Sequence, residues 1–308
     1  MVYKKMKVLF VRSGNSGIDP ISQNQGESLE KEGIIVSYYD IIGNGVLGYM
    51  RNVNRLKKKI KTVNPDIVHA HYSLSGYIAS LSSNKTPVIT SLMGSDVNDV
   101  DAVQNKITNI FIKYFWKATI VKSDEMKKDN NKITVIPNGV DLNNYFQIAR
   151  ELALKKLNWD SKKKHVLFAS DPDRSEKNYI LARKALDKLP FDEVEVHYLK
   201  NIEQSNMKYY YNACDVLLLT SFSEGSPNVI KEAMACNCPI VSTEVGDVRS
   251  YLLGVEGCYL TTFDVDHVSK SITKALQFEK RTIGRDKMHD LDSTVIAKRL
   301  MKLYNEFI

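Results

Sequence analysis

The sequence predicts an α/β protein with two domains, each built from βαβ units around a parallel sheet. Short uninterrupted apolar runs, such as residues 216–219, alternate along the chain with segments of helical period, as buried parallel strands and their connecting helices do. Several of these runs lead into polar or glycine-containing loops that precede a helix. The length of 308 residues suffices for two domains of ordinary size. We therefore expect two Rossmann-like halves.

Composition places the chain among globular proteins. Hydrophobic residues make up 43% and charged residues 26%, which excludes wholesale disorder. No apolar run approaches the ~20 residues of a membrane span, and the opening segment is typical of a first β-strand rather than a signal peptide. The cysteines show no paired metal-ligand spacing, so we expect free thiols in a reducing cytoplasm; they are Cys214, Cys236, Cys238 and Cys258.

The charge balance indicates anionic partners. A net charge of +7 and a pI near 9.0 suit nucleotide-sugar diphosphates, acidic lipid surfaces or nucleic acid. No nucleic-acid-binding motif accompanies the charge, so we expect no nucleic acid among the partners.

The first domain opens with a strand over residues 7–12, a loop over 13–22 and a helix that ends near residue 33. Gly14 and Gly17 in this loop allow the backbone to approach a phosphate, although a plain βα turn explains them equally well. Further strands are expected at residues 34–40, 66–72, 87–92, 118–122 and 133–137.

Two of these strands end in polar residues. His69 and His71 lie two residues apart and therefore on one face of their strand, at the carboxyl end where ligands gather in open α/β sheets. No further ligands for a zinc site are evident, and a hydrogen-bonded structural histidine is the alternative interpretation. Asp96 stands in the carboxyl-end loop after the strand at 87–92.

Two helices of this domain raise the question of membrane contact. Residues 51–63 form a basic amphipathic helix with six basic residues and no acidic one. Its basic face is either simply solvated or docks on anionic lipid. The helix at 102–117 is rich in aromatic residues, which we expect in the core.

The second domain begins with a strand at residues 165–170 and a charged loop at 171–178. Arg174 and Lys177 stand at the following helix N-terminus, where a guanidinium, an ammonium and free N–H groups can hold a diphosphate. An exposed charged turn is the alternative. A strand at 195–199 and a helix at 207–212 follow.

The stretch from residue 215 to 247 carries the strongest signal. A strand at 216–219, a polar loop, a helix from Pro227 to about residue 236 and a strand at 239–242 form one βαβ unit whose helix N-terminus favours a phosphate. Glu224 in the loop and Glu232 on the helix bracket this N-terminus across roughly 7–8 Å of helix. Carboxylates accept hydrogen bonds from vicinal hydroxyls, so sugar and ribose are natural ligands for the pair.

The order Glu224-Gly225-Ser226-Pro227, Glu-Ala-Met-Ala and Pro-Ile-Val-Ser-Thr resembles the signature of family 4, or group 1, retaining glycosyltransferases. This resemblance implies the GT-B fold, in which two Rossmann-like domains face each other. It also implies that Glu232 binds the donor ribose and that Glu224 approaches the transferred sugar. Residues 224–227 then belong to the donor site.

The resemblance extends to motifs in both domains. It implies that His71 contacts the transferred sugar and that Lys177 holds the donor phosphates with help from Arg174. Further positions that align with family motifs are Gly17 in the first loop, with Ser16 before it, and Asn138 in a Pro-Asn-Gly-Val-Asp motif before the linker. Ser16 and Asp96 are assigned to the acceptor or sugar side. Two positions depart from the family pattern: Ser16 replaces a glycine, and Pro172 stands where the family commonly has the arginine.

The domains are expected at residues 1–145 for the acceptor side and 146–292 for the nucleotide-sugar donor side. Residues 293–308 form a last helix with one apolar stripe: Ile296, Leu300, Leu303, Tyr304 and Phe307. In the GT-B fold this helix crosses back to the first domain.

These observations lead to one functional hypothesis. The chain moves a sugar, with retention, from a UDP- or GDP-sugar to a glycan or lipid-linked acceptor in cell-surface polysaccharide or glycolipid synthesis. We expect no cofactor and no metal. We expect the enzyme to be cytoplasmic and, if the basic helix binds lipid, peripheral on the inner membrane face. The alternatives are a metal-dependent transferase, suggested by the Asp-x-Asp pairs at 99/101, 171/173 and 264/266, a nucleotide-sugar epimerase of the same fold, and a sugar-nucleotide-binding protein without catalysis.

Overall fold

A computed structural model describes residues 5–15, 17–98, 101–127, 130–190 and 193–308. The chain divides into two compact units. Residues 1–139 and 293–308 form the first unit, and residues 140–292 form the second. Residues 140–145, which the sequence analysis assigned to the first domain, group with the second unit.

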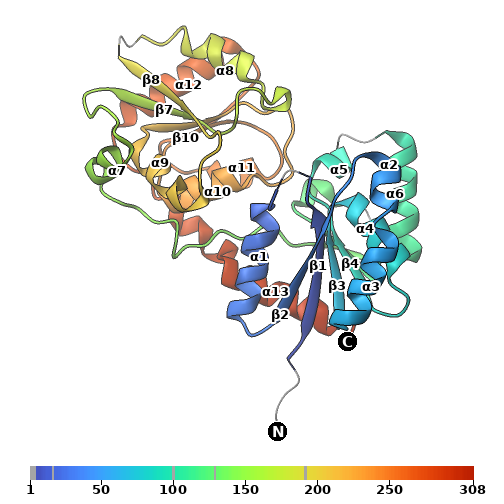
Figure 1. The fold of residues 1–308 in the computed structure, drawn as a ribbon. Coiled ribbons are helices and arrows are strands. Elements are labelled where there is room, and N and C mark those ends of the chain that lie inside the picture. The colour runs from blue at the N-terminus through green and yellow to red at the C-terminus, as the bar shows by residue number, and fades with distance from the viewer. Residues whose placement is uncertain (1–4, 16, 99–100, 128–129, 191–192) are drawn as a thin grey trace. The chain divides into compact units, whose positions relative to one another are not determined.

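The first unit contains a parallel sheet of six strands in the order β2-β1-β3-β4-β5-β6 (Figure 1). Its strands are β1 (Lys7–Ser13), β2 (Ile35–Ile41), β3 (Ile67–His71), β4 (Val88–Ser91), β5 (Ala118–Val121) and β6 (Ile133–Val135). The chain moves outward from β1 to β2 and then in the other direction from β3 onward. The direction of winding therefore changes between β1 and β3, and crevices for ligands open at such switch points in α/β folds.

Helices cover this sheet. They are α1 (Pro20–Lys31), α2 (Gly45–Met50), α3 (Val53–Val63), α4 (Ser73–Ser82), α5 (Ser95–Asn98), α6 (Ala102–Tyr114) and α13 (Ser293–Asn305), with a 3-10 turn at Asp124–Met126. Leu56 and Ile60 of α3 are buried against the sheet, whereas its basic side chains face solvent. The aromatic segment is divided: Trp116 is buried, but Tyr114 and Phe115 are 67% and 49% exposed, so the expectation of a core position was wrong for these two.

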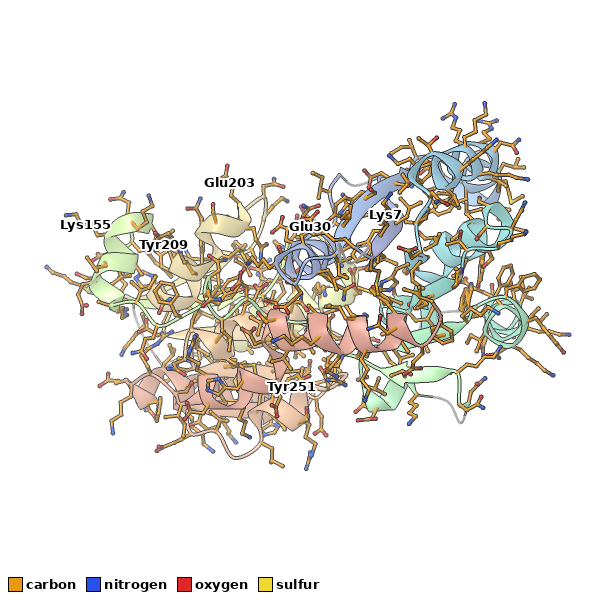
Figure 2. The ribbon with its side chains drawn as sticks, turned by 90° about the horizontal axis from the view of Figure 1, so that it is seen from below. Lys7, Glu30, Lys155, Glu203, Tyr209 and Tyr251 are labelled. Atoms are coloured by element: carbon orange, nitrogen blue, oxygen red, sulfur yellow. The ribbon has the colours of Figure 1, made fainter. Side chains whose placement is uncertain are left out.

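The last helix, α13, belongs to the first unit, as the predicted fold class requires. It packs beside α1, and Figure 2 shows this red helix next to the blue helix that carries Glu30. Ile296, Leu300 and Tyr304 are almost fully buried there because the apolar stripe recurs at helical spacing. Ser293, the first residue of α13, packs against Gly139. A larger residue would not fit at position 139, because a Cβ there would lie 2.8 Å from the Cα of Ser293.

The second unit contains a parallel sheet of five strands in the order β11-β10-β9-β7-β8. The strands are β7 (Lys164–Phe168), β8 (Val194–Tyr198), β9 (Val216–Leu219), β10 (Ile240–Thr243) and β11 (Cys258–Thr261). Its helices are α7 (Arg150–Leu157), α8 (Tyr179–Leu186), α9 (Met207–Ala213), α10 (Asn228–Ala235), α11 (Val248–Leu252) and α12 (Val265–Phe278), with 3-10 turns at Ser175–Lys177, Gln204–Asn206 and Gly284–Leu291. Here the winding changes direction between β7 and β9.

Two details refine the sequence analysis. Pro227, expected as the first helical residue, stands just before α10 with an extended ψ of 117° and acts as its N-cap.

Among the described residues, no helix has both the length and the apolar character that crossing a bilayer demands.

Candidate functional site

The predicted site residues of the second unit follow the two strands that border its switch point. The loop after β7 carries Arg174 and Lys177, and the loop after β9 carries Glu224. Because neighbouring parallel strands deliver their carboxyl ends to one edge of the sheet, the two loops lie together.

Lys177 and Glu224 form an ion pair across these loops. The Lys177 Nζ lies 2.5 Å from the Glu224 Oε1, and the side chains are only 12% and 15% exposed. Ser221 Oγ donates a second hydrogen bond to the same carboxylate oxygen at 2.7 Å. A lysine ammonium has three donors, so this pair leaves Lys177 able to bind a further anion.

Backbone contacts hold the two loops at a fixed distance. Thr220 Oγ1 donates to the carbonyl of Lys177 at 3.0 Å, and the N–H of Phe222 donates to the carbonyl of Glu176 at 3.0 Å. The loop after β10 packs on the same backbone, where Gly246 has a φ of 51° and a Cβ would lie 2.5 Å from the carbonyl oxygen of Gly225. Gly246 is therefore required for both its conformation and the close approach.

Glu232 lies on α10 in a buried polar network. Its Oε2 accepts a hydrogen bond from the Tyr211 hydroxyl at 2.7 Å, and its Oε1 accepts one from Gln204 Nε2 at 3.4 Å. Burial raises the pKa of Glu232, while the hydrogen bonds from Tyr211 and Gln204 oppose that rise. Tyr211 thus orients the Glu232 carboxylate, and the remaining lone pairs of that carboxylate are available to hydroxyl donors.

A second buried charge stands beside Glu232. Lys231 is fully buried, and its Nζ donates to Ser226 Oγ at 2.5 Å, while Ser226 donates to Asp247 Oδ2. Burial lowers the pKa of Lys231 to about 8, against the opposing attraction of Asp247 and Glu232. Ser226 is thereby fixed at the start of α10, next to Pro227. Sequence reasoning identified Ser226 but missed Lys231, which reads as an ordinary surface lysine of a helix.

Arg174 lies apart from this pair. Its Nε donates to Glu176 Oε1 at 2.8 Å within its own turn, and its side chain is 56% exposed. The structure thus brings Lys177 and Glu224 together, while Arg174 contacts Glu176.

In the first unit, the structure separates the roles of the two histidines on β3. His69 is fully buried and bonded on both sides, with Nδ1 2.6 Å from the Tyr304 hydroxyl and Nε2 2.9 Å from Ser91 Oγ. His71 is 4% exposed, and within the described part of the chain neither ring nitrogen has a hydrogen-bond partner. Buried polar atoms are nearly always satisfied, so these nitrogens are suited to a ligand.

The charge state of His71 follows from its surroundings. Burial, together with His69, Lys122 and Arg12 nearby, lowers the pKa of His71 well below its usual value. The ring is therefore neutral at physiological pH and has one donor and one acceptor.

Lys122, directly after β5, is a further residue that sequence reasoning missed. Its buried ammonium donates to Ser91 Oγ at 3.1 Å.

Asp96 positions the backbone next to His71. Its carboxylate accepts hydrogen bonds from the N–H groups of Ser73 at 2.9 Å and Met93 at 2.7 Å, and burial raises its pKa against these bonds. Tyr72, between His71 and Ser73, has a φ of 83°, a conformation that L-residues rarely adopt. Such strain persists only where the surroundings enforce it, and it is frequent at functional sites.

The remaining predicted residues of the first unit lie in its loops. Gly17 is exposed with a φ of 85°, which favours glycine. Ser16 lies outside the described residues, as does Asp99 of the first Asp-x-Asp pair. Asn138 is buried at 4% exposure next to Gly139, where the chain leaves the first unit.

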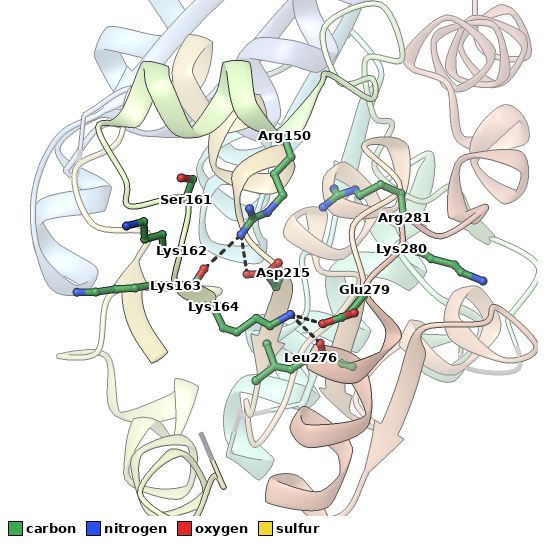
Figure 3. A pocket seen from close by; sticks show the side chains of 11 residues that line it. Arg150, Ser161, Lys162, Lys163, Lys164, Asp215, Leu276, Glu279, Lys280 and Arg281 are labelled. Carbon is green, nitrogen blue, oxygen red and sulfur yellow. Dashed lines mark hydrogen bonds and ion pairs between the residues drawn. The ribbon is translucent and has the colours of Figure 1, made fainter. Parts of the chain in front are cut away.

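A separate cavity of about 390 Å³ opens at the amino ends of the strands of the second unit (Figure 3). Two of its lining cations form ion pairs: Arg150 with Asp215 at 3.0 Å and Lys164 with Glu279 at 2.9 Å. Because the cavity opens at the amino ends of the strands, it lies at the edge of the sheet opposite Lys177 and Glu224. Near this edge, within the described residues, His165, Glu195 and His197 place ligand atoms within 4.8 Å of one another, a group that no sequence spacing indicated.

Family models match both halves of the chain. Residues 3–130 match the family described as "Glycosyl transferase 4-like", and residues 150–277 match "Glycosyl transferases group 1". A relative from Campylobacter jejuni, N,N'-diacetylbacillosaminyl-diphospho-undecaprenol alpha-1,3-N-acetylgalactosaminyltransferase, is 25% identical over 309 residues, covering 84% of this chain and 82% of the relative. A Bacillus subtilis protein named as the teichuronic acid biosynthesis glycosyltransferase TuaC is 25% identical over 269 residues, covering 78% and 68%.

Solved structures with the same fold cover nearly the whole chain. Sucrose-phosphate synthase from Thermosynechococcus elongatus has a TM-score of 0.81 at 16% identity, covering 98% of this chain and 99% of that one. HepE of Anabaena in complex with UDP-glucose has a TM-score of 0.77 at 16% identity, covering 98% and 100%. At these identities the similarity is one of fold.

Proposed function

Since the chain belongs to the group 1, or family 4, glycosyltransferases of GT-B fold, we propose that it transfers a sugar from a nucleoside-diphosphate sugar with retention of anomeric configuration. The observation that carries this proposal is the buried Lys177–Glu224 pair at the switch point of the second unit. A cation for the donor phosphates and a carboxylate for sugar hydroxyls stand side by side there. Such an arrangement suits a substrate that carries both groups.

Lys177 would stabilise the leaving group. As the bond between sugar and phosphate breaks, negative charge develops on the nucleoside diphosphate, and an ammonium already held in position interacts most strongly with that state. The ion pair with Glu224 fixes Lys177 before the donor arrives, so little reorganisation is needed. The backbone N–H groups at the start of α10 would add donors to the phosphates.

Glu232 would read the donor ribose and Glu224 the sugar end. Tyr211 and Gln204 fix the Glu232 carboxylate, and vicinal ribose hydroxyls would donate to its remaining lone pairs. Glu232→Gln should then weaken binding of nucleoside diphosphate by about ten- to a hundredfold, whereas Glu224→Gln should slow transfer and leave that binding nearly unchanged. Equal loss of nucleoside diphosphate binding in both variants would contradict this division.

We propose His71 as a contact of the transferred sugar and Asp96 as the residue that holds its strand end. His71 is neutral and buried without a partner among the described residues, so it can exchange hydrogen bonds with a hydroxyl. Gly17 and Asn138 are proposed for the donor side, and Arg174 for the phosphates if its turn rearranges, on the family resemblance.

The acceptor is proposed to be a glycan or a lipid-linked sugar of a cell-surface polysaccharide pathway. The Campylobacter jejuni relative is named for a diphospho-undecaprenol-linked acceptor, and the Bacillus subtilis relative for teichuronic acid biosynthesis. A cytoplasmic location is proposed as well, and the four free cysteines are consistent with a reducing compartment.

The donor can be identified by a screen of nucleotide sugars. UDP-sugars and GDP-sugars should be tested for protection against thermal unfolding, since a ligand that binds the native state raises Tm. The protecting donor should be hydrolysed slowly, and NMR of the transfer product should show the anomeric configuration of the donor. Release of an epimerised nucleotide sugar without transfer, or an inverted product, would refute the proposal.

Metal independence is tested in the same assay. Lys177 and helix N–H groups supply the positive charge that a divalent ion supplies in other transferases, so rates in EDTA and in added Mg²⁺ or Mn²⁺ should be equal. Loss of transfer in EDTA that Mg²⁺ restores would favour the metal-dependent alternative.

A further inference from the structure

At the β7–β8 edge of the second unit, three side chains with the chemistry of zinc ligands converge. His165 lies near the amino end of β7, directly opposite Glu195 in the register of β8, and His197 follows two residues later on the same face. His165 is fully buried, whereas Glu195 and His197 keep 36% and 19% of their side chains exposed. The group is therefore closed beneath and open to solvent on one side.

The spacing of the ligand atoms fits a single tetrahedral ion. His165 Nδ1 lies 3.0 Å from His197 Nε2 and 3.7 Å from Glu195 Oε2, and His197 Nε2 lies 3.9 Å from the same oxygen. Ligands at about 2.0–2.2 Å from a tetrahedral zinc ion are separated from one another by roughly 3.3–3.5 Å. Shifts of a few tenths of an ångström would place all three ligand atoms within bonding distance of one ion.

Neighbouring groups already orient each ligand. His165 Nε2 lies 2.8 Å from the carbonyl oxygen of Asp160, which can only accept, so the neutral ring carries its proton on Nε2 and presents the Nδ1 lone pair. Lys163 Nζ donates to Glu195 Oε1 at 2.6 Å and leaves Oε2 toward the histidines. Trp159 stacks on the His197 ring at a centroid distance of 3.4 Å and fixes its plane.

We propose that His165, Glu195 and His197 bind a zinc ion at this edge of the second unit, with water as the fourth ligand. On binding, the His165–His197 hydrogen bond is replaced, and the proton on His197 Nε2 moves to Nδ1. The ion ties the edge strand β8 to β7. It lies at the amino end of β7, whereas Lys177 follows the carboxyl end, so the ion has no part in sugar transfer.

The test uses the full chain, stripped of metal and titrated with ZnCl₂. We expect one zinc per chain, a rise in Tm, and a change in Trp159 fluorescence in a Trp116→Phe background, since Trp159 contacts His197. Co²⁺ at the same site should give the visible absorption of a four- or five-coordinate ion. Mg²⁺, which prefers oxygen ligands, should produce none of these changes.

The partly exposed ligands provide the decisive variants. His197→Gln and Glu195→Gln should each weaken zinc binding by about a hundredfold or more, while His289→Gln, an exposed histidine of the same unit, should leave it unchanged. Circular dichroism must show that each variant is folded. Absence of stoichiometric zinc binding to the wild type, or equal zinc affinity of the His197→Gln and His289→Gln variants, would overturn the proposal. Both results are independent of transferase activity.

Discussion

At the scale of single residues, the pairing of Lys177 with Glu224 makes the first prediction. If Lys177 stabilises the leaving diphosphate as proposed, Lys177→Ala removes that charge and should lower kcat/KM by about a hundredfold or more. The control is Lys188→Ala, which removes an exposed lysine that pairs with Asp266 at the surface of the same unit. The measurement is steady-state transfer by both folded variants. Near wild-type kcat/KM in Lys177→Ala would contradict the assignment.

The two histidines of β3 should respond in opposite ways. His69→Leu removes the hydrogen bond to the Tyr304 hydroxyl and one of the two hydrogen bonds of Ser91 Oγ, which keeps its bond from Lys122, and it should cost about 1–3 kcal/mol of unfolding free energy. His71→Leu keeps the volume and removes two unpaired nitrogens, so it should cost less than about 1 kcal/mol. It should nevertheless slow transfer by about tenfold. Urea unfolding and kinetics on both variants test this, and a stability loss confined to His71→Leu would refute it.

Because of Lys231, the free energy of unfolding should vary with pH in the alkaline range. Burial lowers its pKa from 10.5 to about 8, so between these values the unfolded chain binds more protons than the folded one. Stability attributable to this residue therefore rises with pH across that window and is lost as pH falls toward 8, by on the order of 3 kcal/mol in total. Relative to Lys231→Met, the wild type should gain stability between pH 8 and 10.5.

Urea unfolding of wild type and Lys231→Met across this pH range measures the difference, because the other titrating groups are common to both proteins. Lys188→Met is the matched control, since its lysine is exposed. A difference in stability between wild type and Lys231→Met that stays constant with pH would show that the buried lysine is not perturbed.

At the scale of elements, α3 and α2 define the candidate membrane contact. The apolar stripe of α3 is buried in the first unit through Leu56 and Ile60, so it is not available for insertion. The preceding helix α2 instead exposes Val46 and Leu47, each 76% accessible. Each basic residue near an anionic surface contributes about 1 kcal/mol, screened over roughly 8 Å in physiological salt.

Vesicle co-sedimentation tests this contact. Binding should require anionic lipid, fall with added salt, and weaken when Lys57, Lys58, Lys59 and Lys61 are replaced by Gln. A charge-matched control replaces four exposed lysines of the second unit: Lys155, Lys162, Lys184 and Lys188. If both quadruple variants sediment alike, α3 does not contact the membrane.

At the scale of the whole molecule, the return of α13 to the first unit makes the stability of that unit depend on the chain's last residues. A chain that ends at Asp292 loses the buried Ile296, Leu300 and Tyr304, each worth about 1.5–3 kcal/mol. That loss is comparable to the stability of a typical domain. The first unit should unfold at much lower urea, whereas the second unit should be little affected.

The two tryptophans allow each unit to be followed separately. Trp116 lies in the first unit and Trp159 in the second, so Trp159→Phe and Trp116→Phe backgrounds report one unit each. Truncation should shift the Trp116 transition and leave the Trp159 transition in place. An equal shift of both would show that the units do not unfold independently.

The sequence by itself determined the fold class and the family, and it predicted the candidate site positions. Apolar strand runs, helix starts and the motif around Glu224 are local patterns, and local patterns express the conformational preferences of adjacent residues. Lys177, Glu232 and His71 were likewise predicted as site residues from their places at strand ends and on α10, and their roles stay predictions. Boundaries were less accurate, as at Pro227, because helix ends depend on capping geometry.

Only the tertiary structure decided which of these residues meet. Lys177 pairs with Glu224, 47 positions away, while Arg174 turns to Glu176. The Tyr304 hydroxyl, 235 positions from His69, bonds to that histidine, whereas neither ring nitrogen of His71 has a hydrogen-bond partner among the described residues. The zinc group likewise arises from the register of two neighbouring strands. Strand order and register in a parallel sheet join segments that are distant along the chain, and no local pattern encodes such a contact.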